Sequence, residues 1–357
     1  MKNTPLTRQR DSNMELLRII AAFGVIVLHY NNATIGGAYG AVPATSLGAF
    51  VLYYLEAMFL CAVDLFMMIM GYFQFKKRRV NVAKPLMLLV QVSIVRIAAY
   101  LLNWLLADGA MSAKGLITAF LPSNHFIAIY CTVYLLSPYL NLLLEHLSIK
   151  RQRILAVVLL LLFSLHPTAL HILSGLGFTL NGMSTISNTG SASGYTLVNY
   201  IMMYILGALC RDISIGKKSI IGFFLCQLPL FALEAVSEIF DMSLGQRSYC
   251  QPLVVGCAFF AVLIFKELKL GSRRWINTLS GGTLMVYLTH KHLFPLFRIP
   301  EAAAKGTVSV LTNLLITCAV CYGAGWLFHT AYTFLTKPLS RFLTNKLQRF
   351  SIDTSEK

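Results

Sequence analysis

The chain has 357 residues, of which 57% are hydrophobic and only 12% are charged, and its net charge is +16. A typical soluble domain has about 25% charged residues, so composition excludes an ordinary soluble protein and predicts one that crosses a membrane several times. The positive charges lie in short clusters between apolar stretches, a distribution that argues against a nucleic-acid partner.

Ten apolar stretches are long enough to cross a bilayer, which takes about 17–25 residues each. In chain order they cover 14–32, 48–73, 82–105, 124–144, 153–173, 195–211, 219–238, 251–267, 275–296 and 307–330. The loops between them alternate between rich and poor in Lys and Arg, as the positive-inside rule describes. We therefore predict an all-α bundle of about ten transmembrane helices within a single domain, 1–357. Both termini and the short tails 1–13 and 338–357 are expected in the cytoplasm.

The first apolar stretch, MELLRIIAAFGVIVLHY at 14–30, carries one arginine and one histidine, Arg18 and His29. Eleven residues of α-helix return to within about 20° of the same face and rise about 16 Å. An ionisable group inside a bilayer is costly and usually faces a protein interior or a hydrated cavity. With the N-terminus inside, Arg18 lies near the cytoplasmic face and His29 in the outer third. Glu15 is a possible but weaker partner for Arg18 because it lies at the interface.

Further ionisable side chains lie in the second and third spans. By depth, Glu56 and Arg96 fall in the outer half with His29, while Asp64 lies nearer Arg18. Structural pairing between helices explains Glu56 and Arg96 as well as a functional role does, and for Asp64 it is the better explanation. His29 itself has a purely structural alternative, a core histidine that donates to a backbone carbonyl.

Two more histidines end or begin spans on the outer side. His290 closes the ninth span at a depth close to that of His29, and His125 opens the fourth. Either can line an outer cavity or lie among the lipid headgroups. The loops 31–47 and 174–194 on this side carry no charge and suit a neutral ligand such as a sugar, although a solvated connector is as good an explanation.

On the inner side, the run Lys76, Lys77, Arg78 and Arg79, followed by Lys84, forms a basic region near Arg18. Such a region can hold phosphates, and the positive-inside rule also accounts for it. The eight cysteines lie mostly in apolar spans without metal or redox spacing, so no metal site is expected. Nucleotide-binding loops, HExxH and GxSxG are absent from the sequence.

Several of these segments together resemble the bacterial membrane acyltransferase-3 family. Arg18 and His29 on the first helix are similar to its arginine–histidine motif. VDLFMMIMGYF at 63–73, HFIAIYCTVYLLSPYLN at 125–141, GYTLVNYIMMYILGALCR at 194–211 and GGTLMVYLTH at 281–290 resemble its later helices, especially in capsule and exopolysaccharide O-acetyltransferases.

The resemblance implies transfer of an acyl group, usually acetyl, from cytoplasmic acyl-CoA to a hydroxyl of a cell-surface glycan or lipid-linked sugar, in the plasma membrane of a bacterium. It implies His29 as the base and Arg18 as a residue oriented toward the donor, acetyl-CoA. Relatives often carry Arg-x-x-Arg at the inner end of the third helix, and here the equivalent is Asn81-x-x-Lys84.

From these expectations we assign candidate roles. The catalytic candidates are His29, Arg18, Arg96 and Glu56, with Arg96 as a stabiliser of the oxyanion by its depth. The expected donor-binding residues are Arg18, Arg78, Arg79 and Lys84. The expected acceptor-binding residues are His290, Asp64 and His125, with membrane lipid as a further partner. The competing interpretation is a transporter or flippase that uses the intramembrane charges, although no inverted repeat is visible. A non-catalytic membrane module is a third possibility.

Overall fold

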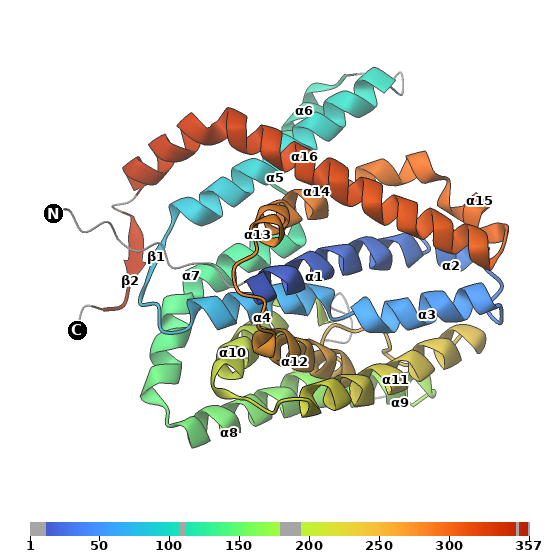
Figure 1. The fold of residues 1–357 in the computed structure, drawn as a ribbon, viewed down its shortest axis with the longest axis horizontal. Coiled ribbons are helices and arrows are strands. Elements are labelled where there is room, and N and C mark those ends of the chain that lie inside the picture. Colours follow the sequence, from blue (N-terminus) through green and yellow to red (C-terminus); the bar gives the residue numbers. More distant parts are fainter. Residues whose placement is uncertain (1–11, 107–110, 179–193, 348–349, 356–357) are drawn as a thin grey trace.

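The computed structural model describes residues 12–106, 111–178, 194–347 and 350–355. The expected N-terminal tail, apart from its last two residues, lies outside the described part. Most of the described chain is helical, which confirms the all-α prediction, and most of the long helices run roughly along the long axis of the molecule (Figure 1). This arrangement is that of a helical membrane bundle.

The helices are α1 (Ser12–Asn31), α2 (Ala38–Ala41), α3 (Leu47–Phe59), α4 (Ala62–Gln74), α5 (Ala83–Leu106), α6 (Ala113–Phe120), α7 (His125–His146), α8 (Ile149–Leu160), α9 (His166–Gly175), α10 (Leu197–Leu209), α11 (Lys218–Ile239), α12 (Pro252–Glu267), α13 (Arg274–Gly281), α14 (Thr283–Leu293), α15 (Ile299–Ala304) and α16 (Thr307–Leu347). A π-helical turn, Leu161–Leu165, joins α8 to α9, and the strands are β1 (Arg79–Asn81) and β2 (Ser351–Asp353).

Seven helical stretches of the described chain are long and apolar enough to cross a membrane. They are Ser12–Asn31, Leu47–Gln74, Ala83–Leu105, Ala113–His146, Ile149–Gly175, Lys218–Ile239 and Thr307–Pro338. The other three expected spans contain shorter helices, namely α10, α12 and the pair α13 and α14, each with fewer than the roughly 20 residues that a bilayer needs. The protein is a multi-pass membrane protein, and the number ten and the orientation stay predictions.

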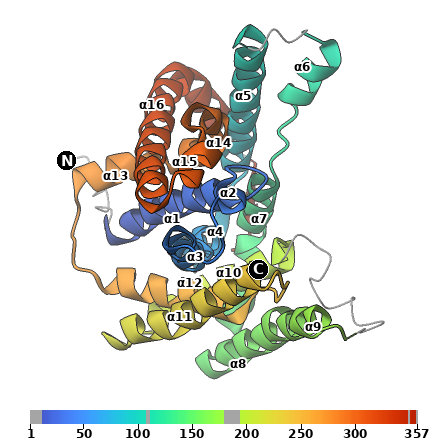
Figure 2. The ribbon, with the colours of Figure 1, turned by 90° about the vertical axis from the view of Figure 1, so that its right-hand side faces the viewer.

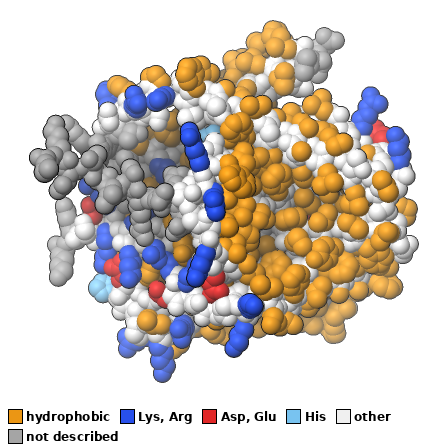
Figure 3. Space-filling view, in the orientation of Figure 1, with side chains coloured by type: hydrophobic (Ala, Val, Ile, Leu, Met, Phe, Trp, Pro, Cys, Tyr) orange, Lys and Arg blue, Asp and Glu red, His pale blue; other side chains and the backbone are white. Residues whose placement is uncertain are grey.

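A broad apolar surface covers one part of the molecule, and a row of Lys and Arg side chains borders it (Figure 3). Exposed Leu, Ile, Val and Phe side chains occur on α8, α11 and α16. A soluble monomer rarely exposes such a large apolar area, so this surface is the one that faces lipid.

The first helix lies at the centre of the bundle, with α3 and α4 on one side and α14 and α16 on another (Figure 2). Within its most apolar window 72% of the residues are buried, against 22–61% for the other six spans. Glu15 in the first turn complements the positive end of the helix dipole. An apolar helix enclosed on every side explains why its polar side chains meet other protein groups instead of lipid.

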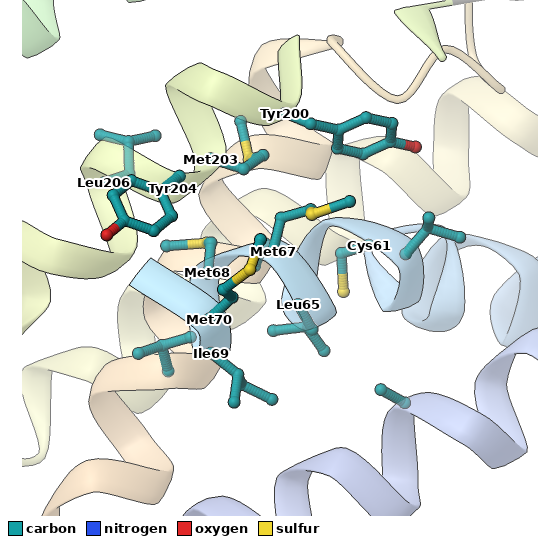
Figure 4. Close-up of a cluster of buried hydrophobic side chains, with 14 of the residues drawn as sticks. Cys61, Leu65, Met67, Met68, Ile69, Met70, Tyr200, Met203, Tyr204 and Leu206 are labelled. Carbon is teal, nitrogen blue, oxygen red and sulfur yellow. The ribbon is translucent and has the colours of Figure 1, made fainter. Parts of the chain in front are cut away.

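The main core lies where α4 packs against α10, among Met67, Met68, Met203, Tyr204 and Cys61 (Figure 4). Two glycines allow the backbones to touch. A Cβ at Gly71 would lie 2.0 Å from the carbonyl oxygen of Tyr204, and a Cβ at Gly207 would lie 2.1 Å from that of Met68. Close approach through small residues is a common way to hold membrane helices together.

The C-terminal segment was expected to be a short tail, but the structure shows it as part of the fold. Helix α16 continues to Leu347, and β2 then pairs antiparallel with β1, with Val80 opposite Ile352. A helix of 41 residues is about 60 Å long, roughly twice the thickness of the hydrocarbon core. The end of α16 therefore projects from the membrane and carries β2 to the α4–α5 connection.

Candidate functional site

Two histidines from distant parts of the chain form a pair near the end of α1. His29 Nδ1 lies 2.6 Å from His290 Nε2, and the two rings stack with centroids 4.9 Å apart and 11° between their planes. His290 is fully buried and His29 half-buried. The structure thus joins the histidine expected to be the base with one expected to bind the acceptor.

The hydrogen bonds around this pair fix which ring nitrogens carry protons. His290 Nδ1 lies 2.9 Å from the carbonyl oxygen of Val286, and a carbonyl can only accept, so His290 Nδ1 must donate. In a neutral His290 the Nε2 atom is then an acceptor, and His29 Nδ1 donates to it. The Nε2 atom of His29 keeps its lone pair, which is the arrangement that a general base requires.

The turn that follows α1 holds His29 in place through two glycines. A Cβ at Gly36 would lie 2.2 Å from the carbonyl oxygen of Tyr30 and 2.7 Å from that of His29, so only glycine fits. Gly37 has a φ of 83°, in the left-handed region that glycine adopts without strain. Tyr30 anchors the same turn to α16 through its hydroxyl, which donates to Val310 and Asn313.

Arg18 and Lys84, both expected to bind the donor, line one cavity of about 220 Å³. Arg18 forms an ion pair with Glu15 at 2.6 Å, so the partner expected to be weaker is the one that the structure contains. The ammonium group of Lys84 lies over the ring of Tyr134, 4.6 Å from its centroid. Two cations beside an apolar wall suit an anionic group on a flexible organic chain.

Tyr287 connects this cavity with the histidine pair. It lines the cavity together with Phe126, Tyr130 and the end of α13. Its ring centroid lies 6.3 Å from that of His290 and 5.3 Å from that of Phe126. The Arg18 cavity and the histidines therefore share one neighbouring side chain.

The two arginines of the basic run make their contacts beside the β1–β2 sheet. Arg78 pairs with Glu145 on α7, and Arg79 donates to Ser351 at 2.8 Å and lies 3.9 Å from Asp353. Neither of them lines the Arg18 cavity. Burial and the neighbouring Lys84 and Arg211 lower the pKa of Lys77, a sign that positive charge is concentrated here.

Arg96 and His125 make other contacts. Arg96 donates to the carbonyl oxygens of Ser123 and Thr118, and so ties α5 to α6 and to the connection between α6 and α7. His125 is exposed, and its ring lies 5.4 Å from that of Tyr195. The described contacts of Arg96 are those of a structural residue.

Glu56 belongs to a cluster of charges that the sequence did not reveal. It accepts from Asn31 at 2.8 Å and lies 4.0 Å from Arg247, which also binds Glu234 at 2.5 Å and Glu238 at 2.7 Å. Glu234 lies in the expected span 219–238. The cost of an ionisable group inside a bilayer, which drew attention to Glu56, therefore applies to Glu234 as well. No sequence signal distinguishes Arg247 from other loop arginines.

Asp64 is fully buried between α4 and α10. Its Oδ1 atom lies 3.5 Å from Asn199 Nδ2, and its Oδ2 atom has no hydrogen-bond partner among the described residues. Within the same residues, no three His, Cys, Asp or Glu side chains converge as metal ligands. Most of the expected sugar-binding loop 174–194 lies outside the described part of the chain.

Comparison with known proteins adds one finding. A family model described as an acyltransferase domain matches residues 11–330, which include every helix from α1 to α15 and most of the apolar part of α16. No curated protein and no solved structure matches the chain.

Proposed function

The chain belongs to this acyltransferase family and is a membrane acyltransferase, and we propose that it transfers an acetyl group from acetyl-CoA to a hydroxyl of a cell-surface polysaccharide or its lipid-linked precursor. The acceptor is reached from the outer side of a bacterial plasma membrane and the donor from the cytoplasm. The observation that carries this proposal is the pairing of His29 with His290.

In the proposed reaction, His29 Nε2 takes the proton of the acceptor hydroxyl while the hydroxyl oxygen attacks the thioester carbonyl carbon. The tetrahedral intermediate collapses, the carbon–sulfur bond breaks, and the thiolate of CoA leaves with the proton from His29. His290 acts as a positioning residue, because it accepts from His29 Nδ1 and keeps the lone pair on Nε2. Imidazole is suited to this double role because it exchanges a proton near neutral pH.

The proposed donor position follows from the cations of the inner cavity. The phosphates of the donor are held on the cytoplasmic side near Arg18 and Lys84, and its flexible arm extends past Tyr287 toward His29. Arg18 lies eleven residues before His29 on one helix, about 16 Å away, so it is too far to contact the reacting carbonyl. A donor-binding role suits it better than a catalytic one.

The test is a two-sided assay in proteoliposomes, with labelled acetyl-CoA outside and a panel of soluble glycans inside. We expect acetylated glycan in the lumen, and His29→Ala should reduce its rate by at least about 100-fold. His146→Ala, which replaces an exposed histidine at the end of α7, is the matched control and should retain activity. Release of the glycan from the lumen without acetylation, equally fast in the His29→Ala variant, would support a transporter and reject the proposal.

A further inference from the structure

An open hollow of about 750 Å³ lies between α13 and α16, apart from the cavity beside Arg18. Its wall contains Arg273 and Arg274, the rings of Trp275 and Trp326, and the side chain of Thr278. The turn of α13 that carries Leu279 faces this hollow, while Ser280 and Gly281 line the Arg18 cavity. The short helix α13 therefore separates two distinct sites.

Hydrogen bonds to the start of α1 set the level of the hollow relative to the membrane. The backbone N–H of Ser12 donates to the carbonyl of Gly271 at 2.9 Å, and that of Arg273 donates to the hydroxyl of Ser12 at 2.6 Å. Because α1 is a membrane helix that begins at Ser12, the hollow lies at one surface of the bilayer. Figure 3 shows Lys and Arg bordering the apolar surface in the region where Figure 1 places α13.

Among the described residues, no carboxylate balances the two arginines of the hollow. Both arginines are exposed, and neither takes part in an ion pair within the described part of the chain. Arg273 uses only its Nε atom, which donates to the carbonyl of Leu270 at 3.1 Å. The side chain of the N-cap residue Arg273 does not cap α13, so the positive end of the helix lies at the same place. Arginine binds phosphate through paired N–H donors, so the hollow favours an anion.

The two tryptophans indicate that this anion is attached to something apolar. Trp275 is 61% exposed, and Trp326 donates its Nε1–H to the carbonyl of Thr278 at 3.2 Å. Tryptophan is enriched at the level of lipid headgroups, where one edge is polar and the ring is apolar. A soluble phosphate would leave these rings without a partner.

We propose that this hollow binds the headgroup of an anionic phospholipid of the adjacent leaflet. The phosphodiester lies between Arg273 and Arg274, and the glycerol and upper acyl chains lie against Trp275 and Trp326. The inference does not depend on the proposed acetyl transfer, because it uses none of the residues assigned to that reaction.

The three tryptophans of the chain make a direct test possible. In a Trp104→Phe protein only Trp275 and Trp326 fluoresce. The full-length protein in micelles of an uncharged detergent is titrated with phosphatidylglycerol or phosphatidylcholine brominated on the acyl chains near the glycerol. We expect half-maximal quenching at a mole fraction at least about fivefold lower for the anionic lipid.

Two variants in the same background separate specific binding from general attraction. Arg273→Gln with Arg274→Gln should abolish the preference for the anionic lipid, while Lys217→Gln with Lys218→Gln, at another basic loop, should preserve it. Equal quenching by the two lipids overturns the proposal, and this comparison does not require the arginine variant to fold. Displacement of the brominated anionic lipid by free coenzyme A also overturns it, because the hollow would then be a site for soluble phosphates.

Discussion

Replacement of His290 by leucine tests the role of the histidine pair most directly. Leucine is close to histidine in volume but cannot accept the hydrogen bond from His29 Nδ1, which spans 2.6 Å in the structure. An unpaired donor in a buried position costs about 1–3 kcal/mol. If this cost raises the free energy of the transition state, the rate falls by about fivefold to 150-fold. Because His29 is half-buried and water can partly replace the acceptor, we expect kcat to fall about tenfold.

The assay is the initial rate of acetyl transfer at saturating donor and acceptor. His290→Gln restores an acceptor oxygen and should recover part of the lost rate. The double variant of His29→Ala with His290→Leu should be no slower than His29→Ala alone, because His290 acts only through His29. A His290→Leu enzyme with the normal kcat, or losses that multiply in the double variant, would refute the positioning role.

Three further predictions concern the donor site and the packing of the bundle. Arg18→Gln should raise the KM for acetyl-CoA about tenfold with little change in the KM for the glycan, because it removes one charge-assisted contact. Gly207→Ala should lower the free energy of unfolding by about 1–3 kcal/mol, since the new Cβ would lie 2.1 Å from a carbonyl oxygen of α4. Arg247→Met should destabilise the protein by roughly 1–3 kcal/mol, because the buried carboxylate of Glu234 loses its cation.

Each of these three has a matched control. Arg341→Gln, at an exposed arginine of α16 outside the cavity, should leave the KM for acetyl-CoA unchanged. Gly323→Ala, where a Cβ meets no atom within 4 Å, should not destabilise the fold in a denaturant titration. Lys305→Met, at an exposed lysine, should have the same Tm as the wild type. If a test variant behaves like its control, the contact that we assigned to it does not matter energetically.

The sequence predicted the fold class because apolar length alone identifies membrane helices, whatever their packing partners are. Three helices illustrate the limit. Helices α10, α12 and α14 have 13, 16 and 11 residues, although the apolar runs that contain them are longer. Hydropathy counts apolar residues in loops and helices alike, so it cannot tell where a helix ends.

The site was predicted in part. Depth along a helix placed His29 and His290 at a similar level, and the structure pairs them, but depth also placed Arg96 near His29. Rotation about the helix axis decides which neighbour a side chain meets, and it depends on packing that spacing does not encode. Arg96 accordingly donates to Thr118 and Ser123. Arg247 was not predicted because only its carboxylate partners distinguish it from other loop arginines, and the folded structure is needed to identify those partners.

A central helix with a cation at one end and a base at the other provides a way to act across a membrane without moving the helices. Arg18 and His29 share one face of α1, about 16 Å apart, and α1 packs against α3, α4, α12, α13, α14 and α16. Acetyl-CoA, the proposed donor, likewise separates its phosphates from its thioester by a flexible arm. If the phosphates bind near Arg18, the thioester can reach His29 past Tyr287, whose ring lies 6.3 Å from that of His290. Under the proposed function, the distance between Arg18 and His29 is the depth to which the donor must extend into the membrane to meet an acceptor from the other side.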